Sequence, residues 1–182
     1  MQNNKDEKKK IDMIKNIAIV IGVIGVFVIL SSVLQAGPVS KGKAPDFKIP
    51  VANSAASNTS EILKLSDLKG KIVILDFWST TCPPCLAQIN VLKRIKRDYK
   101  AKKIEIVGLA VGGESLERIK IFAAQRQINY PTGPDSRGVA ATTYKVSSLP
   151  TLFIINKKGN IVDSHIGYQP ESTLVKKIKK YL

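Results

Sequence analysis

The stretch that decides the fold is IVILDFWSTTCPPC, from Ile72 to Cys85. Its first half is an apolar run interrupted by one charge, Asp76, which is typical of a strand buried on both faces of a sheet. Its second half carries the chain's two cysteines, Cys82 and Cys85, separated by two prolines. The sequence therefore predicts a cysteine pair at the point where a buried strand ends.

Apolar periodicity on the C-terminal side of this stretch predicts alternating helices and strands. Strands that alternate with helices imply parallel pairing, and a hairpin near the C-terminus adds antiparallel strands. The sequence thus predicts an α/β fold, with one mixed central sheet flanked by helices on both faces. The expected helices are 85–100, 115–127 and 171–182, and the expected strands are 72–78, 104–111, 151–155 and 160–166.

A hairpin-like β extension is expected ahead of this sheet. Residues 46–50 are typical of a first edge strand, and the small polar residues that follow predict a loop. Residues 61–71 predict a second short strand and a turn. The folded domain is therefore expected over 46–182, with 38–45 as a linker.

The segment 16–37 contains no charged residue and is almost purely aliphatic from 17 to 34. A helix of this length is sufficient to cross a bilayer core of about 30 Å. A cleaved signal peptide is the alternative, but a cut after Ala36 would place the bulky Leu34 where a small residue is required. We therefore expect an uncleaved transmembrane anchor over 16–37.

The flanking charges predict the orientation of this anchor. Five lysines lie in the tail 1–15, and lysines next to a first apolar segment tend to stay in the cytoplasm. We expect a single-pass protein of the cytoplasmic membrane, with a cytoplasmic N-terminus and its domain in the periplasm or an equivalent space. That compartment is oxidising, so a close cysteine pair can exist there as a disulfide.

The formal net charge is +15, and most of the excess lies outside the tail. Such an excess in a cytoplasmic protein would suggest nucleic acid as a partner, but the predicted compartment argues against it. The basic segments 93–103 and 175–180 lack regular interleaving with aromatic residues and fit solvated helix faces. We expect no nucleic-acid partner, and weak attraction to anionic lipid is the alternative role of these charges.

The position of the cysteine pair at a helix start favours redox chemistry. The unpaired backbone N–H groups and the macrodipole at this end favour a thiolate on Cys82. Pro83 and Pro84 are tolerated in the first helical turn. Cys85, one turn further in, should be less exposed, which gives an outer nucleophile and an inner resolving thiol.

Three other uses of the pair are open. A structural zinc site needs about four ligands, and His165 is the only histidine. A structural disulfide closing so short a loop would constrain the unfolded chain little. A copper carrier that combines the two cysteines with His165 is the non-enzymatic alternative. We expect no metal, and no cofactor besides a redox-active Cys82–Cys85 disulfide.

Several motifs together resemble the thioredoxin superfamily. The segment 75–85, LDFWSTTCPPC, is followed by a helix and later by SSLPTLFIINKKGNIV, 147–162. The segments APDF (44–47) and LSDLKGK (65–71), with the anchor, narrow the resemblance to the TlpA/ResA-like family of membrane-anchored thiol–disulfide oxidoreductases. The resemblance covers roughly 43–182 and implies a thioredoxin-like fold.

The resemblance implies roles for individual residues. Cys82 would be the attacking thiol and Cys85 the resolving thiol. Pro150 would be a cis-proline that faces the disulfide and turns the backbone of Leu149 toward a bound substrate chain. Asp76 matches the buried aspartate of thioredoxin, which implies that it accepts the proton of Cys85. An acid that reaches solvent is the alternative for Asp76.

Residues next to the cysteines are expected to contribute to the partner surface. We expect Thr81, Pro83, Pro84 and Trp78 to join Leu149 and Pro150 there, although Trp78 resembles the packing tryptophan of the family. Thr81 replaces the tryptophan that often precedes the first cysteine in thioredoxin-like motifs. Gln88 replaces a glutamate of several relatives, so proton transfer should depend more heavily on Asp76.

The combined hypothesis is a membrane-tethered reductase of disulfides in exported proteins. The resemblance suggests apocytochrome c among its substrates, and an upstream membrane thiol carrier as the source of electrons. A peroxiredoxin, with Cys82 as the peroxidatic cysteine, is the enzymatic alternative.

Overall fold

The computed structural model describes residues 13, 15–26, 38–39, 41–52, 60–99 and 103–182. The chain divides into two units, Met1–Ala36 and Gly37–Leu182, which are considered separately.

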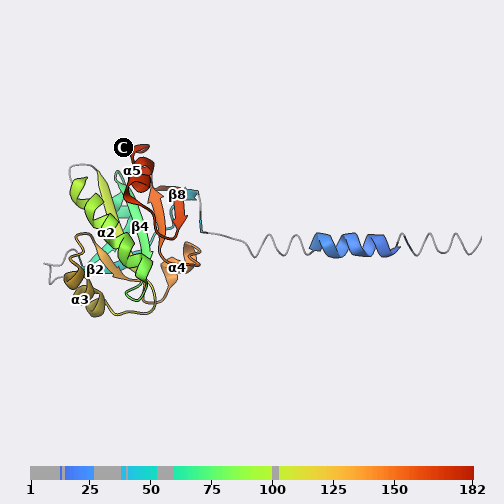
Figure 1. Cartoon of the computed structure of the whole chain (residues 1–182), viewed down its shortest axis with the longest axis horizontal. Coiled ribbons are helices and arrows are strands. Elements are labelled where there is room, and N and C mark those ends of the chain that lie inside the picture. Colours follow the sequence, from blue (N-terminus) through green and yellow to red (C-terminus); the bar gives the residue numbers. More distant parts are fainter. Residues whose placement is uncertain (1–12, 14, 27–37, 40, 53–59, 100–102) are drawn as a thin grey trace, which may run out of the picture. The chain divides into compact units, whose positions relative to one another are not determined.

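In the first unit, residues 15–26 form a helix (Figure 1). Among the described residues, no helix is both long and apolar enough to cross a membrane. Residues 27–37 of the predicted anchor and most of the predicted tail lie outside the described residues. The anchor therefore stays a prediction.

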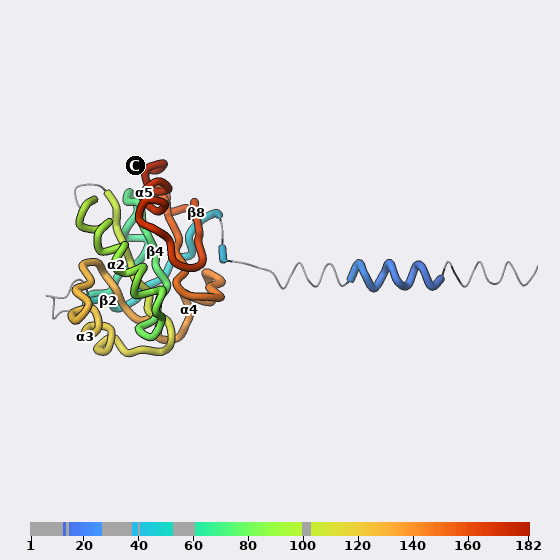
Figure 2. Tube along the Cα trace, viewed as in Figure 1, coloured from blue at the N-terminus to red at the C-terminus, as the bar shows by residue number. Residues whose placement is uncertain are grey.

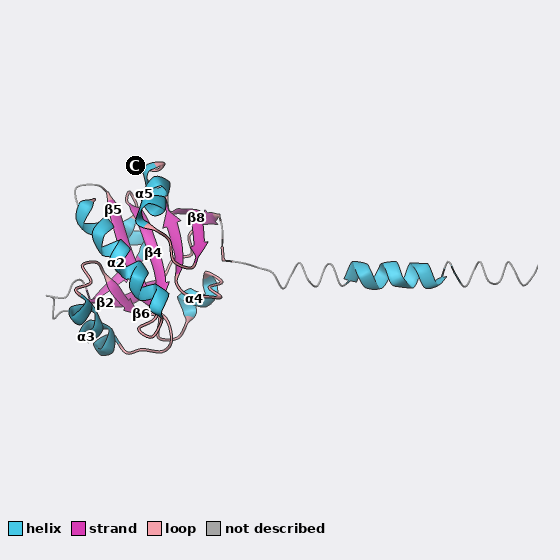
Figure 3. Cartoon of the chain, viewed as in Figure 1, coloured by secondary structure: helices cyan, strands magenta, loops and turns pink. Residues whose placement is uncertain are grey.

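In the second unit, the described residues form one eight-stranded sheet (Figure 3). Its strand order is β1-β8-β7-β4-β5-β6-β2-β3. The strands are β1 (Gly42–Lys43), β2 (Lys48–Ala52), β3 (Ser60–Lys64), β4 (Ile72–Trp78), β5 (Ile104–Ala110), β6 (Thr132–Pro134), β7 (Thr151–Ile155) and β8 (Asn160–Ile166).

Strand β4 lies in the interior of the sheet. It runs parallel to β5 and antiparallel to β7, and all seven of its residues are buried. This double burial accounts for its continuous apolar sequence. The predicted mixed sheet is confirmed, with parallel pairing at β4–β5–β6 and antiparallel pairing elsewhere.

Helices cover both faces of the sheet. On one face, Trp78 and Ile74 pack in a cluster with residues of α2, α3 and α5, and we call it the motif face. On the other, Phe77 and Phe153 pack with Tyr144 beside α4, and we call it the aromatic face. The helices are α2 (Pro83–Asp98), α3 (Leu116–Arg126), α4 (Val139–Thr143) and α5 (Glu171–Lys179), with a 3-10 turn at Leu65–Leu68.

The N-terminal extension is a hairpin of β2 and β3, as predicted. The structure differs from the prediction in adding β1 and β6, which have two and three residues, and α4, which has five. Part of the predicted linker 38–45 thus belongs to the sheet, because β1 pairs with β8. At β6, a Cβ on Gly133 would lie 2.0 Å from the carbonyl oxygen of Pro50, so the close approach of β2 requires glycine.

Candidate active site

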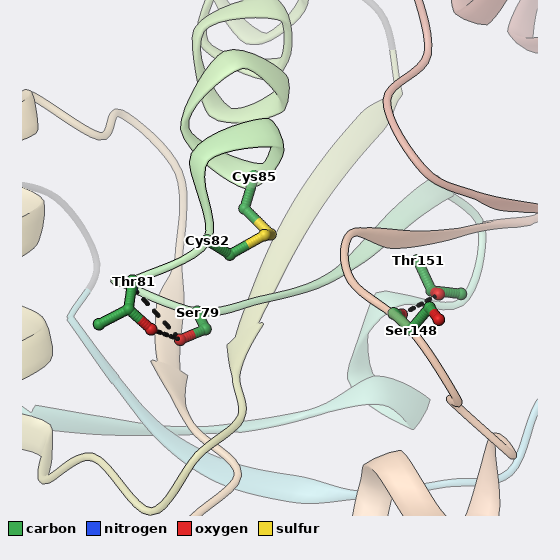
Figure 4. Close-up of a disulfide and its surroundings, with 6 residues drawn as sticks. All are labelled: Ser79, Thr81, Cys82, Cys85, Ser148 and Thr151. Atoms are coloured by element: carbon green, nitrogen blue, oxygen red, sulfur yellow. Dashed lines mark hydrogen bonds between the residues drawn. A yellow bond between two sulfur atoms is a disulfide. The ribbon is translucent and has the colours of Figure 1, made fainter.

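Cys82 and Cys85 form a disulfide at the start of α2, with their Cα atoms 5.2 Å apart (Figure 4). Figure 2 shows the chain passing from β4 into this helix. Cys82 is the residue that caps α2, and two prolines occupy the first helical positions. Cys82 is half-buried, whereas Cys85 is fully buried. The outer and inner positions therefore follow the predicted order.

A tight turn connects β4 to the first cysteine. The backbone N–H of Cys82 donates to the carbonyl oxygen of Ser79 at 3.3 Å, and the hydroxyls of Ser79 and Thr81 lie 3.2 Å apart (Figure 4). Thr81, Pro83 and Pro84 are exposed around the disulfide. The turn therefore presents these three residues to solvent.

The segment before β7 lies next to this turn. The Leu149–Pro150 peptide bond is cis, as predicted. Thr151 pairs with Phe77 in the sheet, which places the start of β7 beside the end of β4. In Figure 4 the two sulfur atoms extend from α2 toward the side where Ser148 and Thr151 lie. Leu149 is half-buried and Pro150 is buried.

Asp76 lies in the middle of β4 and is fully buried. Its side chain points into the motif face, because it alternates along the strand with Phe77, which lies in the aromatic face. Neither carboxylate oxygen has a hydrogen-bond partner. Burial raises the pKa of Asp76 to about 8. This carboxyl can therefore gain or lose a proton near neutral pH.

Trp78 requires a correction, because it is fully buried and cannot belong to a partner surface. Its ring lies 5.2 Å from the ring of Phe122 on α3. Its Nε1 lies 3.0 Å from the position that a Cβ of Gly108 would occupy. Trp78 therefore packs beneath the site, as the family's packing tryptophan does.

Gln88 and His165 have other surroundings. Gln88 is fully buried, and its Oε1 accepts a hydrogen bond from the backbone N–H of Gln169 at 2.7 Å. It therefore joins α2 to the segment before α5. His165 is half-buried on β8, opposite Leu152. Within the described ranges, no three His, Cys, Asp or Glu side chains are grouped so that they could hold a metal ion.

Sequence reasoning missed three residues near the site. Glu114 accepts a hydrogen bond from the Thr80 hydroxyl, in the turn before the cysteines. Tyr130 is buried, and its hydroxyl has no partner; burial, and secondarily the charge of Asp76, raises its pKa well above the usual value. Gly108 pairs with Asp76 across β4 and β5. A glycine inside a buried strand was the one available signal.

The chain is similar to proteins of known family and structure. Residues 41–164 match the AhpC/TSA family. Thiol-disulfide oxidoreductase ResA of Bacillus subtilis is 34% identical over 137 residues, which cover 75% of this chain and 73% of that protein. Thioredoxin-like protein YneN of the same organism is 30% identical over 137 residues, covering 75% and 76%.

Solved structures show the same fold. A Chlorobium tepidum protein assigned as a thiol:disulfide interchange protein DsbE has a TM-score of 0.69 and 29% identity, covering 80% of this chain and 99% of that one. The exposed lipoprotein thioredoxin Etrx1 of Streptococcus pneumoniae has a TM-score of 0.63 and 26% identity, covering 75% and 99%. The predicted thioredoxin-like fold is confirmed.

Proposed function

Because the chain belongs to the AhpC/TSA family and is a ResA-like thiol–disulfide oxidoreductase of the thioredoxin superfamily, we propose that it reduces disulfides of exported proteins through Cys82 and Cys85. The observation that carries this proposal is the disulfide at the start of α2, with one half-buried and one buried cysteine. Such a pair supplies one thiol that a partner can reach and one that acts afterwards.

The first step is attack by the Cys82 thiolate on a substrate disulfide. A bond forms between Cys82 Sγ and one substrate sulfur, and the other substrate sulfur leaves as a thiolate. Pro83 and Pro84 have no N–H, and the N–H of Cys85 already donates to the Cys82 carbonyl oxygen at 3.0 Å. The macrodipole of α2, rather than amide donation from its first turn, is therefore the main support for the thiolate.

The second step is resolution by Cys85. Its proton passes to the Asp76 carboxylate, and the Cys85 thiolate then attacks Cys82 Sγ. The Cys82–Cys85 disulfide forms, the bond between Cys82 Sγ and the substrate sulfur breaks, and that sulfur leaves as a thiolate, so two electrons have passed to the substrate. Asp76 suits this role because its pKa of about 8 lies close to that of a thiol. An upstream membrane thiol carrier would return the two electrons.

The substrate surface would combine two segments around the disulfide. The exposed Thr81, Pro83 and Pro84 form one side, and the backbone of Leu149 before Pro150 offers hydrogen-bonding groups on the other. Thr81 makes this surface smaller and more polar than a tryptophan would. Apocytochrome c is the substrate that the family resemblance suggests.

Attachment to the cytoplasmic membrane is also part of the proposal. It is supported by the uncharged segment 16–37 and the lysines of the tail 1–15. This orientation would place the cysteines in an oxidising compartment, where a reductase needs a membrane source of electrons. Carbonate-washed membranes should retain the full-length chain, and its release into the wash would contradict the anchor.

Insulin reduction tests the proposed activity on the full-length chain in detergent. With dithiothreitol as reductant, the wild-type chain should accelerate insulin precipitation, and Cys82→Ser should lose at least about a hundredfold of that rate because it lacks the attacking thiol. Unchanged activity in Cys82→Ser would refute the mechanism. Peroxide turnover or Cu(I) binding in place of insulin reduction would instead favour the peroxiredoxin or the copper carrier.

A further inference from the structure

The turn that connects β4 to Cys82, residues 79–81, is bonded to a segment far away in the chain, and we call it the motif turn. One of its hydrogen bonds is local, because the N–H of Cys82 donates to the Ser79 carbonyl oxygen at 3.3 Å. The Thr80 hydroxyl instead donates to Oε1 of Glu114, which lies 34 residues away in the sequence. Glu114 thus joins the motif turn to the loop between β5 and α3.

The loop that carries Glu114 is held on both sides of this residue. On one side, the N–H of Val111 donates to the Trp78 carbonyl oxygen at 2.9 Å, next to the motif turn. On the other side, the Ser115 side chain caps α3 by accepting a hydrogen bond from the N–H of Arg118 at 3.2 Å. The backbone around Glu114 therefore holds its carboxylate against the motif turn.

The charge of this carboxylate has little to offset it. A glutamate carboxylate is negatively charged at neutral pH. Its second oxygen, Oε2, is buried and has no hydrogen-bond partner in the described structure. No lysine or arginine among the described residues forms an ion pair with Glu114. The Thr80 hydroxyl is thus the one group that donates to this carboxylate.

Glu114 brings a charge to a stretch of sequence that has none of its own. Residues 77–92 include the motif turn, both cysteines and the first turns of α2, and no side chain among them is charged. Thr80 lies two residues before Cys82, and two residues span at most about 7 Å. This span is comparable to a Debye length of about 8 Å, and buried charges are screened less than exposed ones. The carboxylate is therefore close enough to act on a charge at Cys82.

Cys82 is negatively charged only in the reduced pair. In the proposed function, the reduced pair consists of a Cys82 thiolate and a Cys85 thiol, whereas neither sulfur of the disulfide is charged. When the pair reduces a partner disulfide, the Cys82–Cys85 bond forms and the partner S–S bond breaks. The two partner sulfurs leave as thiolates with the two electrons, and the proton of Cys85 passes to Asp76. Oxidation of the pair thus removes the negative charge from Cys82.

We propose that Glu114, held against the motif turn by Thr80, favours the oxidised state of the cysteine pair and so makes the reduced pair a stronger reductant. The inference rests on the proposed function, in which the Cys82 thiolate donates the electrons. The macrodipole of α2 stabilises that thiolate, whereas the Glu114 carboxylate repels it. This repulsion raises the free energy of the reduced pair and leaves the uncharged disulfide unaffected.

Other charged groups on the elements around the cysteines are placed differently. Glu171 forms an ion pair with Arg94 at 2.6 Å, and Glu117 forms one with Lys120 at 3.6 Å. Within the described ranges, Glu114 is the acid that a hydrogen bond joins to the motif turn. Further charged or titratable side chains on these elements are Asp76 on β4, Arg118 on α3, Tyr130 before β6, Lys145 after α4 and His165 on β8.

The test combines two measurements on the full-length chain in detergent. One is the redox equilibrium with glutathione, and the other is the pH profile of alkylation of the reduced chain by iodoacetamide. Glu114→Gln keeps an oxygen that can accept from Thr80 but removes the charge. The midpoint of Cys82 alkylation should fall by about half a pH unit. Above both midpoints, the equilibrium constant should shift about threefold toward the dithiol, because half a unit corresponds to this factor.

Glu117→Gln is the matched control. Glu117 is an acid in the first turn of α3, three residues after Glu114, but its side chain is 75% exposed and its partner is Lys120. Its replacement should leave the alkylation midpoint and the redox equilibrium unchanged. Unchanged values in Glu114→Gln, or an equal shift in Glu117→Gln, would overturn the inference.

Variants of Thr80 test the connection itself and serve equally if Glu114→Gln does not fold. Thr80→Val removes the hydroxyl, so the carboxylate can turn away from the cysteines, and the midpoint should fall. Thr80→Ser keeps the hydroxyl and should match the wild type. In the Glu114→Gln background, Thr80→Val should cause no further shift. An unchanged midpoint in Thr80→Val, or additive shifts in the double variant, would contradict the role of Thr80.

The proposed function is measured separately from this inference. Glutathione equilibria and alkylation rates require only the cysteine pair, whereas insulin reduction requires the proposed activity. Insulin reduction by the wild type with no shift in Glu114→Gln would refute the inference alone. The expected shift without insulin reduction by the wild type would refute the proposed function alone.

Discussion

The two faces of the sheet differ in the hydrogen bonding of their buried polar groups. On the aromatic face, the Tyr144 hydroxyl has its partner in the backbone of Pro45. At the start of α4, the buried Asp135 accepts hydrogen bonds from the backbone N–H groups of Ala140 and Ala141, at 3.2 and 2.8 Å. Polar groups here stabilise the fold in the usual manner.

On the motif face, three buried polar residues lack such pairing. Asp76, Trp78 and Tyr130 are as deeply buried as Tyr144, yet their polar atoms have no partners in the described residues. Trp78 and Tyr130 lie in the same core cluster as Cys85, and Asp76 alternates along β4 with the aromatic-face residue Phe77. The difference indicates that the aromatic face provides stability, whereas the motif face gives up stability to keep a carboxyl near the reactive sulfurs.

The largest effect should come from the aromatic face. Phe153 lies 5.0 Å from the ring of Tyr144 and 5.8 Å from that of Phe77. Phe153→Ala should lower the free energy of unfolding by about 3–5 kcal/mol, because it removes a buried ring and leaves a cavity. Urea unfolding measures this loss. The pH profile of insulin reduction should stay unchanged, and a shifted profile would break the distinction between the faces.

The next effect is the change in the free energy of unfolding when the buried Asp76 or the buried Asp135 is replaced by asparagine. We expect opposite signs for the two substitutions. Burial raises the pKa of Asp76 from 3.8 to about 8, so the folded chain holds a proton that the unfolded chain releases between these values. The wild type therefore loses stability as the pH rises from about 4 to about 8. Asp76→Asn should be more stable by roughly 2–4 kcal/mol at pH 7, and this gain should vanish near pH 4.

Asp135→Asn is the matched control for this experiment. Its carboxylate accepts two backbone hydrogen bonds at the start of α4, so its loss should lower stability by about 0.5–2 kcal/mol at pH 7. Urea unfolding of both variants at pH 4 and 7 gives the comparison. Destabilisation by both substitutions at pH 7 would show that the two carboxylates have similar environments.

A smaller effect than that of Asp76→Asn should come from Gly108, where neighbouring side chains already fill the space beside the backbone. Gly108→Ala would bring a methyl group within 2.7 Å of the Thr132 hydroxyl, so we expect a loss of about 1–3 kcal/mol. Trp78 is the only tryptophan, and its fluorescence should shift because its indole must move. Gly133→Ala, which collides with the Pro50 backbone, should destabilise without that shift. Unaltered emission in Gly108→Ala would exclude the close contact with Trp78.

Local patterns predicted the parts of the fold that are long and periodic. The apolar run of β4, the helix after Cys85 and the burial of Asp76 follow from residues near each other in the chain. Strands β1 and β6 and helix α4 have five residues or fewer, which is too short for an apolar periodicity to be recognised in the sequence.

The site was predictable only in part, because some of its residues are far apart in the chain. The motif identified Cys82 and Cys85 directly, whereas Tyr130 joins Cys85 in the same core cluster from a segment far from the motif in the chain. Its own segment contains nothing that distinguishes it from a core tyrosine. Trp78 was misplaced because proximity to the motif in sequence does not indicate on which side of the strand end a ring packs.

The central claim is that Cys82 attacks and Cys85 resolves, and trapping of the mixed disulfide tests it most directly. The reduced, full-length Cys85→Ser chain is mixed with insulin, quenched with acid, and digested for mass spectrometry. We predict a covalent adduct in which the peptide containing Cys82 is linked to an insulin cysteine, and at least about tenfold less adduct in Cys82→Ser, whose remaining cysteine is buried. Equal adduct formation through Cys85 would contradict the account.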